Sequence, residues 1–83
     1  MKWYVYMLRC SDRTLYTGIT NDLDRRVKEH NSNNKLAAAY TRGRRPVNLV
    51  YHETCKSRSE ALKREAEIRK MNRSEKEILL DRN

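Results

Sequence analysis

The chain has 83 residues, of which 19 are Lys or Arg and 11 are Asp or Glu, so its formal net charge is +8 with neutral histidines. This length allows one small domain, which we expect to span residues 1–83, and it excludes large multi-domain enzymes. Hydrophobic residues make up 37% of the chain. A domain of this size buries only about 60–65% of the surface that its unfolded chain exposes, so deep enclosed cofactor pockets are excluded as well.

Membrane insertion is not expected. The longest apolar run, Trp3–Leu8, ends at Arg9, far short of the roughly 20 residues that a spanning helix needs, and it is also too short for the apolar part of a secretory signal. The two cysteines, Cys10 and Cys55, do not form a disulfide framework. We therefore expect a cytoplasmic protein with free cysteines and no membrane association.

The excess of positive charge points to a polyanionic partner. A sequence pI of about 9.9 favours association with nucleic acid through the release of counterions from phosphates. We expect DNA as the partner, with RNA not excluded. Charge alone does not separate a specific role from non-specific binding, so it has to be joined to a site.

The first elements form a predicted β-hairpin. Trp3–Cys10 is rich in aromatic and β-branched residues and reads as a strand, and β character resumes at Leu15–Thr20 after the turn residues 11–14. Gly18 lies inside the second strand, where it offers no side chain for packing. It therefore marks a place where another group closely approaches the backbone.

A helix and a basic loop follow. Asn21 or Asp22 can cap a helix that ends near Asn31. Residues 31–46 form a predicted loop, in which 36–40 could make a helical turn. We expect the basic side chains of this loop to track phosphates. They are Lys35, Arg42, Arg44 and Arg45.

The second half of the chain predicts a strand and two helices. Val47–Thr54 reads as a third strand, and Ser57 with Glu60 fits a capping box that opens a helix running to about Met71. A second capping box at Ser74–Glu77 predicts a short last helix. The order β-β-α-loop-β-α-α indicates an α+β fold.

In both longer helices, polar side chains occupy positions where the helical repeat predicts apolar ones. In the first, Leu23, Arg26, Val27 and His30 share one stripe, so Arg26 and His30 point toward the sheet and can address the same small volume, whereas Arg25 faces solvent. Such conflicts between local pattern and burial tend to mark functional sites.

In the helix after Ser57, the predicted inward face consists of Ala61, Leu62, Ala66 and Ile68. Glu65 points between them. A carboxylate in that position is costly unless it is paired or binds a metal. Two readings stay open here: a structural salt bridge, to Arg26 or another arginine across the sheet, or a metal ligand.

These residues resemble the signature of the GIY-YIG nuclease superfamily. The first signature element matches Tyr4-Val5-Tyr6 and the second matches Tyr16-Thr17-Gly18. Ten residues beyond Tyr16 stands Arg26, followed by His30, and the segment from Ser59 to Glu65 is similar to the helix that carries the family's metal-binding glutamate. Tyr4 replaces the glycine of the first element. The resemblance covers nearly the whole chain and is closest to small stand-alone bacterial members of unassigned role.

The resemblance implies a three-stranded antiparallel sheet flanked by helices, and hydrolysis of phosphodiester bonds with one divalent cation. Tyr6 and Tyr16 correspond to tyrosines that orient or activate the attacking water, Arg26 to the catalytic arginine and His30 to a frequent helper. Glu65 corresponds to the ligand of Mg²⁺ or Mn²⁺. Whether Tyr6, Tyr16 or His30 takes the proton stays open.

The leading hypothesis is a metal-dependent endonuclease that acts on DNA, with branched or damaged DNA as candidate substrates. We expect a protein partner to supply substrate specificity in place of an attached domain. One alternative is a non-catalytic basic module that binds nucleic acid with the same fold. Another is an adaptor that docks a partner protein through Ile78, Leu79 and Leu80, although these residues fit better as part of the domain's own core.

Overall fold

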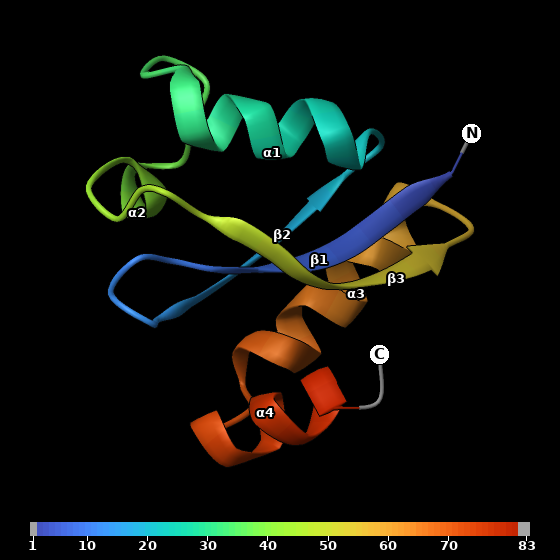
Figure 1. The fold of residues 1–83 in the computed structure, drawn as a ribbon. Coiled ribbons are helices and arrows are strands. Elements are labelled where there is room, and N and C mark those ends of the chain that lie inside the picture. Colours follow the sequence, from blue (N-terminus) through green and yellow to red (C-terminus); the bar gives the residue numbers. More distant parts are fainter. Residues whose placement is uncertain (1, 82–83) are drawn as a thin grey trace.

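The computed structural model describes residues 2–81 and contains an antiparallel three-stranded sheet in the order β2-β1-β3 (Figure 1). The elements in chain order are β1 (Trp3–Arg9), β2 (Leu15–Thr20), α1 (Leu23–Ser32), α2 (Ala39–Arg42), β3 (Asn48–Cys55), α3 (Arg58–Arg69) and α4 (Arg73–Asp81). This confirms the α+β fold with helices flanking the sheet. Within residues 2–81, the helices are all too short or too polar to span a bilayer.

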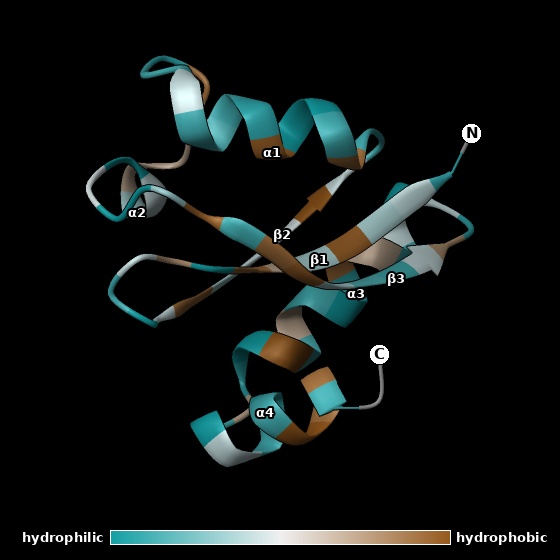
Figure 2. Cartoon of the chain, in the orientation of Figure 1, coloured by the Kyte–Doolittle hydropathy of each residue, from teal (hydrophilic) through white to brown (hydrophobic). Residues whose placement is uncertain are grey.

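The central strand β1 carries the core on both of its faces. Helix α1 covers one face of the sheet, and α3 and α4 lie on the other (Figure 1). Because strand side chains alternate, Val5 and Met7 pack toward α3, while Tyr6 and Leu8 join the cluster beneath α1. All four are at most 1% exposed. In Figure 2 hydrophobic colour lies on parts of the strands, and α1 is mostly hydrophilic apart from positions next to the sheet.

Helix α1 begins as its sequence predicts. Asp22 is the N-cap, and its carboxylate accepts a hydrogen bond from the Arg25 amide at 3.1 Å. Leu23 and Val27 pack on the sheet. The helix ends at Ser32, one residue beyond the predicted end.

The inward face of α3 differs from the prediction. Ala61 and Ile68 are fully buried, but Leu62 is 39% exposed and Ala66 also faces solvent. Residues 61, 64, 65 and 68 share the stripe that contacts the sheet, because they follow the three- and four-residue spacing of a helix. Polar residues 64 and 65 thus occupy the inward face in place of Leu62 and Ala66.

The inward position of Arg64 is compensated by β3. Its Nε donates to the two carboxylate oxygens of Glu53 at 3.0 and 3.1 Å, and its Nη2 donates to one of them at 3.0 Å. The Tyr51 hydroxyl donates to the same carboxylate. Partial burial opposes ionisation of Glu53, but the hydrogen bonds from Arg64 and Tyr51 outweigh it and lower the pKa of this carboxyl group. The ion pair fastens α3 to β3.

Helix α4 begins before the capping box predicted at Ser74. Asn72 is the capping residue: its side chain accepts from the Glu75 amide at 2.9 Å, and its own amide donates to the Glu75 carboxylate at 2.9 Å. Leu79 and Leu80 pack against the core below the sheet, as expected, whereas Ile78 is 57% exposed.

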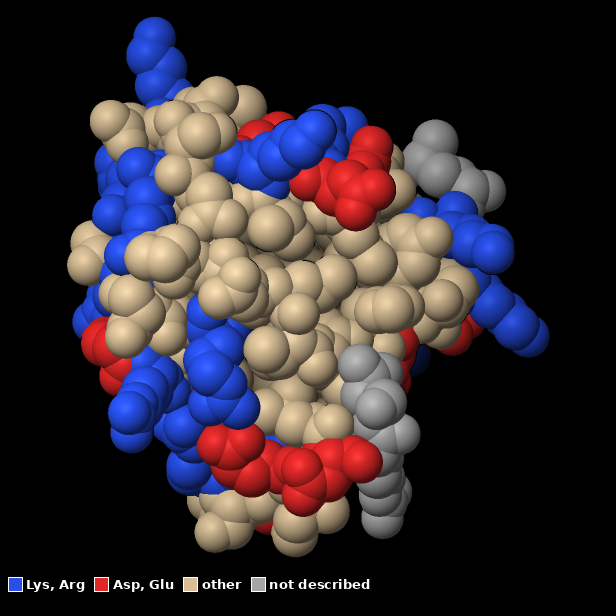
Figure 3. All heavy atoms as spheres, viewed as in Figure 1, with Lys and Arg blue, Asp and Glu red and all other residues tan. Residues whose placement is uncertain are grey.

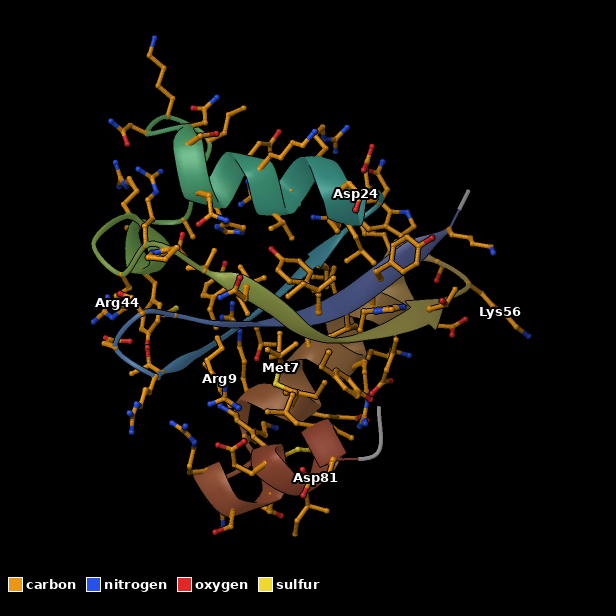
Figure 4. All side chains as sticks on the ribbon, in the orientation of Figure 1. Met7, Arg9, Asp24, Arg44, Lys56 and Asp81 are labelled. Atoms are coloured by element: carbon orange, nitrogen blue, oxygen red, sulfur yellow. The ribbon has the colours of Figure 1, made fainter. Side chains whose placement is uncertain are left out.

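Ion pairs tie α4 to the far end of the hairpin. Glu77 accepts from Arg9 at 3.0 Å and from Arg73 at 2.9 Å, and Arg73 also donates to the carbonyl of Arg13. Figure 4 shows Arg9 reaching from β1 toward α4. This attachment holds α4 at the loop end of the β1–β2 hairpin.

Candidate active site

Gly18 allows the phenol of Tyr6 to lie across β2. The two residues are directly opposite each other in the β1–β2 register. A Cβ atom at position 18 would lie 2.6 Å from the Tyr6 hydroxyl oxygen and 2.8 Å from Cζ, closer than non-bonded atoms approach. The close approach expected at this glycine is therefore made by the side chain of Tyr6.

A chain of hydrogen bonds runs from Tyr6 through His30 to Thr41. The Tyr6 hydroxyl lies 2.8 Å from His30 Nε2, and His30 Nδ1 lies 2.8 Å from Thr41 Oγ1. Thr41 donates its only hydroxyl hydrogen to the carbonyl of Ala38 at 2.9 Å, so its oxygen accepts from Nδ1–H. This assigns the Nδ1–H tautomer to neutral His30, and Nε2 then accepts from the Tyr6 O–H.

Burial keeps both members of this pair neutral near pH 7. His30 is fully buried, and burial, followed by the charge of Arg26, lowers its pKa to about 4. Burial also raises the pKa of Tyr6 to about 12, with smaller contributions from Tyr16 and Glu65, while Arg26 opposes this rise. In the free protein the proton therefore stays on Tyr6.

Tyr16 completes an aromatic group with Tyr6 and His30. Its ring centroid lies 6.4 Å from that of Tyr6 and 5.3 Å from that of His30. Its other neighbour is Tyr40, at 5.9 Å. Because Tyr16 is only half-buried, it forms the boundary between the buried hydrogen-bond chain and solvent.

Arg26 faces this group, as the α1 stripe predicts, and Arg25 is exposed. Both hydrogens of Arg26 Nη1 are used, because this atom donates to Glu29 at 2.9 Å and to the carbonyl of Leu36 at 2.7 Å. These bonds fix the guanidinium near Tyr6, whose pKa it lowers. The guanidinium also hydrogen-bonds the Tyr6 side chain, so Arg26 connects α1 directly to the buried hydrogen-bond chain.

Glu65 reaches the same neighbourhood from the opposite face of the sheet. Its side chain is 17% exposed and lies 3.4 Å from Arg69, one turn further along α3. Of the two readings left open, a salt bridge to an arginine is present, but its partner Arg69 lies on the same helix and not across the sheet, and Arg26 pairs with Glu29 on its own helix. The charge of Glu65 nevertheless contributes to the raised pKa of Tyr6, so the two groups interact around the β2 edge.

A lone carboxylate limits the cation that this site could hold. Within residues 2–81, there is no cluster of three or more His, Cys, Asp or Glu side chains arranged to bind a metal. Mg²⁺ suits such a site, since it commonly binds one or two carboxylates and completes its shell with waters and substrate phosphates. Glu65 therefore fits a magnesium site that is completed by substrate, and it does not fit a closed structural site.

The four basic residues of the predicted phosphate-tracking loop divide into two pairs. Lys35 and Arg42 are exposed. Arg44 instead pairs with Asp12 at 3.0 Å and covers the Tyr40 ring at 4.0 Å, and Figure 4 shows it between α2 and the β1–β2 loop. Arg45 donates to the carbonyl of His30 at 2.6 Å. The second pair thus holds the loop together, although positive charge still gathers on this side of the molecule (Figure 3).

Several residues around this site carried no prediction from the sequence. Thr41 fixes the tautomer of His30 from a separate helical turn, and no sequence pattern links these two residues. Tyr40 could have been noticed as an aromatic residue among basic ones. Arg69 lies four residues after Glu65, a spacing that indicates contact on a helix.

Comparisons with known proteins show the family and fold to which the chain is similar. A family model described as the GIY-YIG catalytic domain matches residues 2–78. A UPF0213 protein of Syntrophus aciditrophicus is 55% identical over 82 residues, covering 99% of this chain and 93% of that protein. UPF0213 protein DP2720 of Desulfotalea psychrophila is 55% identical over 78 residues, covering 94% and 70%.

Two solution NMR structures also match, each covering 98% of this chain and 84% of the other. UPF0213 protein BH0048 of Bacillus halodurans is 43% identical, with a TM-score of 0.62. Protein EF2693 of E. faecalis is 42% identical, with a TM-score of 0.66. From the family model, the full-length relatives and the shared fold together, we conclude that the chain belongs to the GIY-YIG nuclease family, among its small UPF0213 members.

Proposed function

We propose that the protein is a divalent-metal-dependent endonuclease that hydrolyses phosphodiester bonds in DNA, with branched or damaged DNA as its candidate substrates. The observation that carries this proposal is the directed hydrogen-bond chain from Tyr6 to His30 and Thr41, which ends beside Arg26 and Glu65. A hydroxyl whose proton points at a neutral imidazole can pass on a proton as it receives one.

In the proposed reaction, a water oxygen attacks phosphorus, the bond to the leaving oxygen breaks, and the leaving oxygen takes a proton from solvent. The water proton moves to the Tyr6 oxygen, while the Tyr6 proton moves to His30 Nε2. The resulting imidazolium keeps its Nδ1–H bond to Thr41. Tyr6 thus ends the step neutral, so its high pKa is not an obstacle. His30 is the terminal base and, because burial lowers its pKa to about 4, it holds the proton only until it releases it to solvent.

Arg26 would stabilise the transferring phosphoryl group. Charge grows on the non-bridging oxygens of the phosphodiester in the transition state, and a planar guanidinium held in place by Glu29 and Leu36 offers it preorganised donors. Glu65 would hold Mg²⁺ or Mn²⁺, which supplies Lewis-acid stabilisation of phosphate oxygens when bound.

The proposal is tested by comparing Glu65→Gln with Glu67→Gln. Both substitutions remove one carboxylate from α3, but Glu67 is exposed and pairs with Arg64. Purified proteins are incubated with linear, single-stranded and branched DNA in Mg²⁺, Mn²⁺ or EDTA. We expect metal-dependent cleavage that Glu65→Gln abolishes and Glu67→Gln retains, with DNA affinity nearly unchanged in both.

Equal cleavage by wild type and Glu65→Gln would remove Glu65 from the metal site. Binding without cleavage across the whole panel would contradict the nuclease proposal. That outcome would favour the non-catalytic nucleic-acid-binding module, for which the +8 charge and the exposed Lys35 and Arg42 are sufficient.

A further inference from the structure

A pocket of about 290 Å³ opens on the solvent side of Tyr16. It is lined by Leu15, Tyr16, Thr17, Tyr40, Arg69 and Lys76. These residues come from β2, α2, α3 and α4. Its volume is close to the lower limit of about 300 Å³ for small-molecule sites, so it offers room for one small group.

One wall of this pocket is aromatic and apolar. Tyr40 is 38% exposed, and its ring is inclined by 30° to that of Tyr16. The guanidinium of Arg44 lies over one face of the Tyr40 ring, 4.0 Å from its centroid, and holds the ring in place, so a base can stack only on the other face. Leu15 extends this wall along β2. A phosphate ion would gain nothing from such a surface, whereas a flat heterocycle would stack on it.

The opposite wall carries two cations. Arg69 donates to the carbonyl of Thr17 at 3.0 Å and lies 3.4 Å from Glu65, yet 55% of its side chain is exposed. Lys76 is half-buried, and within residues 2–81 no carboxylate forms a salt bridge with it. It is held at the pocket because Glu77 pairs with Arg9 of β1 and Arg73 donates to the carbonyl of Arg13, which fastens α4 to the β1–β2 hairpin. This wall has the donors that a phosphodiester needs.

We infer that this pocket binds one unpaired nucleotide next to the scissile phosphate, with its base on Tyr40 and Leu15 and its phosphate at Arg69 and Lys76. The inference deepens the proposed function and rests on it, because Tyr16 belongs to both sites. A base inside a duplex has its faces covered by neighbouring bases, so only an unstacked base can lie on Tyr40. The pocket would select substrates with an unpaired nucleotide near the cleavage position.

The experiment measures binding in EDTA and therefore does not depend on cleavage. Fluorescence anisotropy gives the affinity of the full chain for a labelled single-stranded oligonucleotide and for the duplex of the same sequence. A second single strand carries 2-aminopurine, whose fluorescence falls when it stacks on an aromatic ring. The variants are Tyr40→Leu with Tyr40→Phe as its control, and Lys76→Gln with Lys63→Gln as a control that removes an exposed charge from α3.

We expect wild type to bind the single strand more tightly than the duplex and to quench 2-aminopurine. Tyr40→Leu should bind the single strand about 5- to 140-fold more weakly and lose the quenching, while Tyr40→Phe should retain both. Lys76→Gln should lower the slope of log affinity against log salt by about 0.7, the value for one phosphate contact on a single strand. Lys63→Gln should leave this slope unchanged.

Unchanged single-strand affinity and quenching in Tyr40→Leu would overturn the inference, as would equal affinity of wild type for duplex and single strand. Equal effects of Lys76→Gln and Lys63→Gln would show that Lys76 acts only through net charge and would remove it from the site. If the protein proves not to cleave DNA, the binding experiment still gives a separate answer. A protein without nuclease activity would still prefer the single strand, and this preference would still depend on Tyr40.

Discussion

At position 18 the absence of a side chain sets the geometry of the proposed proton path. The Tyr6 phenol occupies the space that a Cβ would take, and from there it reaches His30 Nε2. Because the ring is 1% exposed and surrounded by packed atoms, it has little room to move aside. The glycine is therefore a steric requirement of the Tyr6–His30 hydrogen bond.

Gly18→Ala should push the Tyr6 hydroxyl away from His30 and lower the cleavage rate by about 10²- to 10⁴-fold, the usual contribution of a positioned acid–base group. DNA affinity should change little. Initial cleavage rates, with ¹⁵N NMR shifts of the His30 ring as a direct report of the hydrogen bond, check this outcome. An alanine variant with the wild-type rate and ring shifts would show that the phenol tolerates the methyl group.

His30 predicts a pH dependence of stability. In the unfolded chain His30 binds a proton below about pH 6.5. In the folded protein its pKa is lowered to about 4, so it binds a proton only below about pH 4. Between these values the unfolded state binds more protons, so the free energy of unfolding should fall as the pH falls, by up to about 3 kcal/mol. Urea unfolding between pH 7 and 4 measures this slope.

The same series on His30→Gln provides the comparison, and its slope between about pH 6.5 and 4.5 should be much shallower. The carboxylates with lowered pKa values, Asp12, Glu53 and Glu77, lose their contributions only below their ordinary values and thus at lower pH. Parallel curves for wild type and variant would mean that His30 does not have a strongly lowered pKa.

Among the elements, α4 begins with a cap at Asn72, two residues before the predicted cap at Ser74. Asn72 and Glu75 exchange hydrogen bonds between side chain and amide in both directions. This satisfies two of the free amides at the start of a short helix. The helix in turn carries Lys76 and the anchoring residue Glu77, so the cap stabilises one wall of the pocket.

Asn72→Ala should lower the free energy of unfolding by about 1 kcal/mol, the typical value for loss of a helix cap. Ser74→Ala tests the alternative cap, and we expect it to change stability by less than about 0.5 kcal/mol, as for an ordinary surface position. Chemical denaturation of both variants at one pH measures the difference. A larger loss in Ser74→Ala than in Asn72→Ala would restore the capping box predicted from the sequence.

For the whole molecule, the decisive feature is that β2 is an edge strand. The order β2-β1-β3 leaves one side of β2 open, so side chains from the two faces of the sheet can meet around it. Arg26 and His30 come from α1 on one face, and Glu65 comes from α3 on the other. Arg26 lowers and Glu65 raises the pKa of Tyr6, and Arg26 also lowers the pKa of His30.

The charge distribution predicts which basic residues control binding. Lys35→Gln and Arg42→Gln should each weaken binding to duplex DNA of any sequence and lower the slope of log affinity against log salt by about 0.9, the value for one lost phosphate contact. Arg45→Gln should instead lower the free energy of unfolding, since Arg45 holds the His30 carbonyl. Anisotropy titrations at several salt concentrations measure the slopes, and unaltered slopes in Lys35→Gln and Arg42→Gln would place the DNA elsewhere.

The sequence by itself determined the hairpin, the start of α1 to within one residue and the side of α1 that faces the sheet. These features depend on neighbours along the chain: alternation in the strands, the Asp22 cap, and the three- and four-residue spacing that turns Arg26 and His30 inward. The close approach at Gly18 was also predictable, because a glycine weakens the interior of a strand and is favoured there where another group needs the space of a side chain. The catalytic roles of these residues stay a prediction.

Only the tertiary structure decided which groups these side chains meet. A helical period gives the direction of Glu65 but not its partner, and that partner is Arg69 on the same helix and not Arg26. Thr41 fixes the tautomer of His30 across a loop, and the Tyr6–His30 bond joins residues that are 24 positions apart. Such contacts depend on how elements pack in three dimensions, and local periodicity carries no information about that packing.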